Sequence, residues 1–325
     1  MNITCPAMKL LAAAALALGA AAALAQADYP NRPVKIIVPF AAGGPADNYA
    51  RFLAQRLQTE LKQPFVVDDK PGAGSIIGTD AVAKSPADGY TLLMMSNTHT
   101  VNETLVPAKP FKLMDDFVGI APVNYSDLML VVHPSVPVKS VAELIALARS
   151  QPGKLNYASS GTGTPYHMAG ELFKHMAGVN ITHIPYKGSS GARTDVVGGQ
   201  VQMMFDAVTT MGPMAKEGKV RGLATTGLTR NAITPDMPTV AEAGVPRYEA
   251  TIWLGLMAPK NTPPEIVNKL NAAVRKIVGQ PDVKAAWGQQ GAVPMSMGVA
   301  EFQQYLKDDI AKWATIVKVS GAKPD

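Results

Sequence analysis

Two short turns hold the residues of this chain that are best suited to chemistry, and both combine glycine with small side chains. The first turn is Phe40-Ala-Ala-Gly-Gly-Pro-Ala-Asp47, and the second is Ser159-Ser-Gly-Thr-Gly-Thr164, with His167 shortly after it. Each turn runs into a helical pattern with proline in its first turn, at Pro45 and at Pro165, where the missing N–H costs nothing. The free N–H groups at such a helix start can bind a carboxylate or another anion without a charged side chain. The two turns therefore predict two anion-binding positions.

Catalytic and cofactor chemistry are less well supported by the same residues. Ser159 and Ser160 precede His167, but G-x-S-x-G is absent, so hydroxyls that bind solute or cap a helix are favoured over a nucleophile. No stretch matches the phosphate-binding pattern G-x-x-x-x-G-K-[ST]. The five histidines form neither H-x3-H nor H-E-x-x-H, so we expect no metal site and no cofactor.

Alternating strands and helices position these turns. The first turn follows the apolar run Val34–Val38, and a polar cluster, Ser96 to Thr100, follows the run Thr91–Met95. In open α/β sheets, ligands bind beyond the carboxyl ends of the strands, so Ser96 and Asn97 join the candidate site. The other expected strands are Phe65–Val67, Phe117–Val123, Leu128–Val132, Leu155–Ala158, Ile181–Ile184, Val201–Phe205, Val220–Thr225 and Thr251–Ala258.

Helical spacing and capping signals fill the segments between the strands. Thr or Ser three residues before Glu predicts helix starts at Ser140, Thr239 and Thr262. Further helices are expected at about Pro45–Lys62, Thr79–Lys84, Pro165–Ala177, Ala192–Val197, Met211–Glu217 and Val299–Val319. Two series of strand-helix units, each with its own glycine turn, indicate two similar α/β lobes built on mostly parallel, doubly wound sheets.

The amino-terminal residues 1–27 have the pattern of a secretory signal peptide. Lys9 precedes the apolar stretch Leu10–Leu24, which ends in small residues typical of a cleavage site and is short for a membrane span. The single cysteine, Cys5, lies within this leader, so no disulfide is expected in the mature protein. The formal charge of +5 comes without a basic run or a basic-aromatic patch, which argues against nucleic acid as a partner.

The motifs together resemble the Bug-type periplasmic receptors of tripartite tricarboxylate transporters, the TctC family. The resemblance starts with Tyr29-Pro-x-Arg-Pro-Val-x-Ile-Ile-Val-Pro-Phe40, Gly43-Gly44 and Asp47. It continues in order through Lys70-Pro-Gly-Ala-Gly74, Asp88-Gly-Tyr-Thr-Leu-Leu93, Tyr157-Ala-Ser-Ser-Gly-Thr-Gly163, Pro185-Tyr-Lys-Gly188, Met204-Phe-Asp206 and Pro238-Thr-Val-Ala-Glu-Ala-Gly244. Ala46 departs from the family, which often has Thr or Ser there, and this change bears on solute identity.

The resemblance implies a two-lobed periplasmic binding protein of type II-like architecture, with two crossover strands near 123–132 and 248–258 as its hinge. Lobe 1 would comprise residues 28–124 plus 250–325, and lobe 2 residues 125–249. A small carboxylate, whether mono-, di- or tricarboxylate and including aromatic acids, would bind between the two turns. The expected ligand-binding residues are Phe40, Ala41, Ala42, Gly43, Gly44, Ala46, Asp47, Ser96, Asn97, Ser159, Ser160, Gly161, Thr162, Gly163, Thr164, His167, Tyr186 and Asp206.

Three of these residues have an alternative interpretation. Asp47 and Asp206 either stabilise their turns or meet an ammonium group of the solute, because a carboxylate would repel an anion. His167 either faces the solute or packs and caps. The expected protein is a non-enzymatic, monomeric periplasmic receptor that serves integral-membrane transporter subunits. A sensory receptor that contacts a membrane sensor protein is the alternative, and a secreted hydrolase is the third interpretation.

Overall fold

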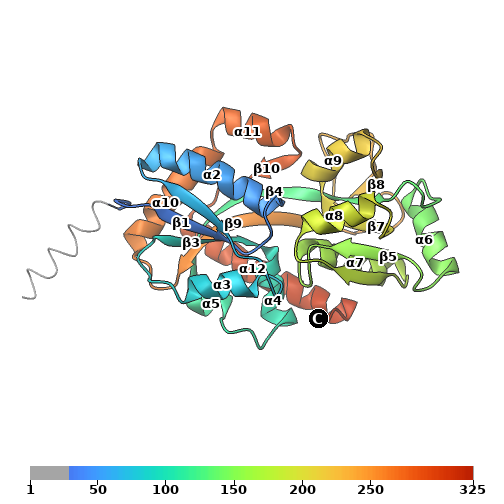
Figure 1. Ribbon diagram of the computed structural model, residues 1–325, viewed down its shortest axis with the longest axis horizontal. Coiled ribbons are helices and arrows are strands. Elements are labelled where there is room, and N and C mark those ends of the chain that lie inside the picture. The colour runs from blue at the N-terminus through green and yellow to red at the C-terminus, as the bar shows by residue number, and fades with distance from the viewer. Residues whose placement is uncertain (1–28, 325) are drawn as a thin grey trace, which may run out of the picture.

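The computed structural model describes residues 29–324, which form two lobes joined by long strands (Figure 1). The expected signal peptide, residues 1–27, lies outside the described residues. The strands are β1 (Val34–Val38), β2 (Phe65–Asp69), β3 (Thr91–Ser96), β4 (Phe117–Val132), β5 (Asn156–Ser159), β6 (Thr182–Pro185), β7 (Met203–Ala207), β8 (Arg221–Thr225), β9 (Thr251–Pro259) and β10 (Ala292–Pro294).

The helices fall into two groups along the chain. In the first lobe they are α2 (Pro45–Leu61), α3 (Ile76–Ala83), α4 (Asn97–Leu105), α5 (Leu113–Asp116), α10 (Pro264–Val278), α11 (Pro281–Gly288) and α12 (Val299–Ser320). In the second lobe they are α6 (Val141–Ser150), α7 (Pro165–Ala177), α8 (Ser189–Val197) and α9 (Val208–Lys216). Within residues 29–324, none of the helices is long and apolar enough to cross a membrane.

The first lobe is a sheet covered by helices on both faces. β1 pairs in parallel with β2 and β3, and β9 runs antiparallel beside β3. Ile36 packs into the cluster of α2 and α10, whereas Ile37 packs with α3 and α12, because successive side chains of a strand point to opposite faces. Burial on both faces explains why this strand is a continuous apolar run.

The second lobe repeats this arrangement. β5 pairs in parallel with β6 and β7, and β7 and β8 flank the end of β4. One face of this sheet is covered by α6 and α7, and the other by α8 and α9. The expected α/β architecture with two lobes is therefore confirmed, and its parallel pairs lie within the lobes while the long connecting strands are antiparallel.

Strand β4 differs from the expectation of two strands separated by Asn124–Asp127. It is one continuous strand of 16 residues. Its polar middle does not form a turn because Asn124 to Asp127 pair with Thr251 to Leu254 of β9, and β10 pairs with the same stretch from the other side. The first part of β4 thus belongs to the first sheet, and residues Leu128 to Val132 pair with the second.

Two expected helix starts are wrong in detail. Thr239 and Glu242 exchange both hydrogen bonds of a capping box, but only a turn follows, since Gly244, with φ at 120°, and Pro246 come too soon for a helix. The helix expected after Thr262 begins at Pro264, and the Thr262 hydroxyl instead donates to the Pro259 carbonyl at 2.8 Å. The Ser140 cap is confirmed, because its hydroxyl accepts from the Glu143 N–H.

The two lobes also meet through an apolar cluster away from the connecting strands. Met168 of α7 packs with Val101 and Leu105 of α4 and with Trp313 and Val317 of α12. The carboxyl-terminal helix therefore bridges the lobes, which lie against each other in this structure (Figure 1).

Candidate functional site

Four helices begin around one point between the lobes. In the first lobe, α2 follows Gly44 and α4 follows Ser96. In the second lobe, α7 follows Thr164 and α8 follows Gly188. Each helix comes shortly after the carboxyl end of a strand, as the alternating pattern requires. The first-turn N–H groups of a helix have no partner within it, so four partially positive helix ends are directed at the same region.

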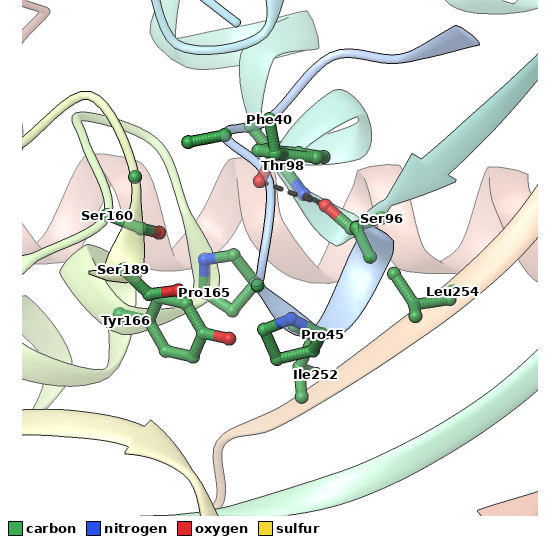
Figure 2. A pocket seen from close by; sticks show the side chains of 14 residues that line it. Phe40, Pro45, Ser96, Thr98, Ser160, Pro165, Tyr166, Ser189, Ile252 and Leu254 are labelled. Carbon is green, nitrogen blue, oxygen red and sulfur yellow. Dashed lines mark hydrogen bonds between the residues drawn. The ribbon is translucent and has the colours of Figure 1, made fainter. Parts of the chain in front are cut away.

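A cavity lies at this convergence, and residues of both lobes line it (Figure 2). Its volume is about 30 Å³, roughly twice the smallest space that holds one water, so a small acid enters only if the lobes part. The lining residues are Phe40, Ala41, Gly44, Pro45, Ala46, Ser96, Thr98, Ser160, Pro165, Tyr166, Gly188, Ser189, Ile252 and Leu254. None of these 14 side chains is charged, which suits recognition of an anion by N–H groups and hydroxyls.

The rest of the first turn holds the loop in shape rather than lining the cavity. The Asp47 carboxylate is buried, accepts from the Gly43 N–H at 2.8 Å and pairs with Arg51 at 2.6 Å. Gly43 has φ at 76°, which a larger residue rarely adopts. The carbonyl of Ala42 accepts from the Ser190 hydroxyl of the second lobe at 3.3 Å. This geometry supports the structural interpretation of Asp47.

The second turn is also stabilised from within. The buried Ser159 hydroxyl lies 2.6 Å from His183 Nε2 and accepts from the Gly161 N–H at 3.1 Å. The Thr164 hydroxyl donates to the Gly161 carbonyl at 2.7 Å. Ser160 lines the cavity and Ser159 does not, so the contact between Ser159 and His183 stabilises the turn.

His167 lies next to the second turn. It is buried, its Nδ1 accepts from the Gly163 N–H at 3.0 Å, and its ring stacks on His183 with 4.0 Å between ring centroids. Burial, and to a smaller extent the nearby positive charge of Lys174, lowers the pKa of His167 to about 4. The packing and capping role is thus the one that the geometry favours for His167.

We expect acid to loosen the second turn. A lowered pKa means that the fold prefers the neutral ring, so this stabilisation is complete above the ordinary pKa of 6.5 and is lost as the pH falls through about 4. Protonated Nδ1 cannot accept from the Gly163 N–H, so the affinity for solute should fall over the same range. Titration calorimetry between pH 7 and pH 4 measures this change in affinity. The control is the variant His133→Gln, because the side chain of His133 bonds to the exposed Ser135. A pH-independent affinity would contradict it.

The remaining predicted residues lie near the cavity or beneath it. Gly161, Thr162, Thr164 and Tyr186 line a neighbouring cavity of about 210 Å³ that shares Phe40 and Ser160 with the first. The Asn97 amide donates to the Thr251 carbonyl at 2.9 Å and so ties α4 to the start of β9.

Arg193 of α8 is a residue of this region that the sequence patterns did not single out. It is buried, and one guanidinium nitrogen lies 3.3 Å from the fully buried Asp206 carboxylate. Its other terminal nitrogen donates across the lobes to the Gly43 carbonyl at 3.3 Å. Burial raises the pKa of Asp206 to about 6, and Arg193 opposes that shift. The pair thus supplies a charge-assisted contact between the lobes beside the cavity.

Residues 49–322 match the model of the tripartite tricarboxylate transporter family receptor. The chain is 38% identical to protein BugT of Bordetella pertussis over 307 residues, 94% of each chain. The structure of R. palustris Rpa4515 with adipate aligns with a TM-score of 0.88 and 36% identity, covering 91% of this chain and all of that one. MatC from Rhodopseudomonas palustris with bound malate aligns at 0.84 and 31%, covering 89% and 100%. This chain belongs to the tripartite tricarboxylate transporter receptor family, the TctC family of solute-binding proteins.

Proposed function

We propose that this protein is a periplasmic receptor that captures a small carboxylate between its lobes and delivers it to the membrane subunits of a tripartite transporter. The observation that carries the proposal is the convergence of four helix starts, two from each lobe, on a cavity without charged side chains. Such a site offers several N–H donors to a carboxylate and no carboxylate of its own to repel it.

The comparisons support the class of solute. Rpa4515 is described with adipate and MatC with malate, and both align over nearly the whole of this chain. The proposed solute of this protein is accordingly a small mono-, di- or tricarboxylate. The proposed receptor acts as a monomer, without cofactor or catalysis, after export by the signal peptide in residues 1–27.

The proposed mechanism is hinge closure. β4 and β9 connect the lobes, and we place the division at residues 28–124 plus 250–325 for lobe 1 and 125–249 for lobe 2. The cavity of about 30 Å³ is too small to admit a dicarboxylate while the lobes touch. Parting of the lobes lets the acid enter, and their return buries it between the four helix starts.

Small-angle scattering tests this mechanism. A panel of mono-, di- and tricarboxylates is first screened by titration calorimetry, and the tightest binder is then added to saturation. The radius of gyration should fall, because the average position of the unliganded lobes is more open than that in the complex. An unchanged radius of gyration at saturation would refute closure, and the absence of binding across the panel would refute the carboxylate receptor itself.

A further inference from the structure

The carboxyl-terminal helix α12 is anchored in the first lobe along its first half. Phe302 and Leu306 are fully buried in a cluster with Trp253 of β9. Farther along the helix, the buried Asp309 carboxylate accepts from the Thr100 hydroxyl of α4 at 2.5 Å. These contacts join α12 to the first sheet and to α4, so the helix moves with the first lobe.

The last turns of the same helix reach the second lobe. Trp313 and Val317 are 2% and 7% exposed, and they pack with Met168, a fully buried residue near the start of α7. Val101 and Leu105 of α4 complete this apolar cluster. Apolar side chains of both lobes are thus buried against one another at the end of α12.

This apolar cluster lies beside the solute site but does not line it. Helices α4 and α7 both begin at the cavity, so their packing against each other sets how the two helix starts are placed. Of the described residues that line the cavity, none belongs to the cluster. When the lobes part, Met168 moves away from Trp313 and Val317, and apolar surface that the closed form buries meets water. Burial of this surface therefore favours the closed form, whichever acid is bound.

We propose that the end of α12, residues 313–320, is a latch that holds the two lobes together and thereby raises the affinity for every solute. The apparent dissociation constant of a receptor rises when the form that completes its site is less populated. The latch changes this population without touching the solute. This inference rests on the proposed carboxylate receptor with hinge closure, and it names residues outside the site that control the closure.

The variant Val317→Ser tests the latch, and Val319→Ser is its matched control. Both variants make the same change on α12, but Val319 is 48% exposed and lies outside the apolar cluster. Titration calorimetry with the panel of mono-, di- and tricarboxylates should show about tenfold weaker binding for Val317→Ser, because the stabilisation from a buried valine is lost. The factor should be the same for each acid that binds the wild type, since Val317 does not line the cavity. Val319→Ser should bind as the wild type does.

Met168→Ala removes the same contact from the side of the second lobe. It should also weaken the binding of each acid by one common factor. The double variant Val317→Ser/Met168→Ala should lose less affinity than the product of the two single factors, because both changes break one contact. In small-angle scattering without solute, Val317→Ser should have a larger radius of gyration than the wild type. With saturating solute, the two proteins should have the same radius.

These outcomes separate failure of the latch from failure of the receptor. If acids bind the wild type and Val317→Ser binds them equally well, the latch is wrong and the receptor function stands. The same holds if the loss differs from one acid to another, or if the two single factors multiply fully in the double variant. If no acid binds the wild type, the receptor function fails, and the scattering of the unliganded proteins still decides the latch: equal radii for Val317→Ser and the wild type would refute it.

Discussion

Replacing Gly188 with valine is expected to abolish solute binding while both lobes remain folded. A Cβ at Gly188 would lie 2.5 Å from the Ala41 Cβ, closer than side chains approach, and Ala41 is held in the first turn. Gly188 begins α8 in the second lobe and Ala41 belongs to the first, so the clash exists only when the lobes meet. The variant should therefore be unable to close around a solute.

Titration calorimetry, melting curves and small-angle scattering separate loss of closure from loss of folding. Gly188→Val should show no binding heat, a nearly unchanged melting temperature without solute, and no compaction on its addition. Gly298→Val is the control, because a Cβ there has no atom within 4 Å and the backbone is extended. If Gly188→Val binds as tightly as the wild type, the lobes do not approach at this point in the complex.

The second large effect concerns the buried ion pair. Arg193→Ala should lower the free energy of unfolding by about 3–5 kcal/mol at pH 7.5, because it leaves the Asp206 carboxylate buried without its counter-charge. It also removes the hydrogen bond to the Gly43 carbonyl across the lobes, so solute binding should weaken. Urea unfolding of the two proteins measures the first effect, and calorimetry the second.

The pH dependence identifies the cause of this loss. Asp206 has a raised pKa of about 6 with Arg193 present, so the fold favours its protonated form. This contribution to stability is complete below the ordinary pKa of 3.8 and is lost as the pH rises through about 6. Without Arg193 the pKa should rise further, so the defect should shrink at pH 5 and in the double variant Arg193→Ala/Asp206→Asn. Lys84→Ala, which breaks a pair in which Lys84 is 70% exposed, should change stability little at either pH. A defect of equal size at both pH values would exclude the buried charge as its cause.

Local signals explain why much of the fold could be predicted. Helix α7 has the predicted bounds because Pro165 fixes its start and Gly178, with φ at 61°, ends it. The β1–α2 unit was predicted within one residue at its helix end, again from proline and apolar spacing. In contrast, α11 and β10 were not predicted, and β4 was divided in two. The polar residues of β4 become strand only through pairing with β9 and β10, which lie far away in the sequence.

The candidate site likewise contains residues that local signals predict and residues that only contacts between distant segments bring in. Phe40, Gly44 and Ser160 could be placed from their turns, and the structure puts them at the cavity. Ile252 and Leu254 also line the cavity. They come from β9, and they lie beside the cavity only because β9 pairs with β4 and β3. Arg193 could not be assigned from spacing, because its partners lie on β7 and in the opposite lobe.

Native mass spectrometry of freshly purified wild-type and Gly188→Val proteins tests most directly whether a small acid is held between the closed lobes. Both proteins are produced in the same host and purified side by side, so each meets the same pool of metabolites. The wild type should carry a non-covalent adduct with the mass of a small carboxylic acid, and Gly188→Val should be free of it. A wild type without an acid adduct, or a variant that carries the same adduct to the same extent, would contradict capture between the two turns.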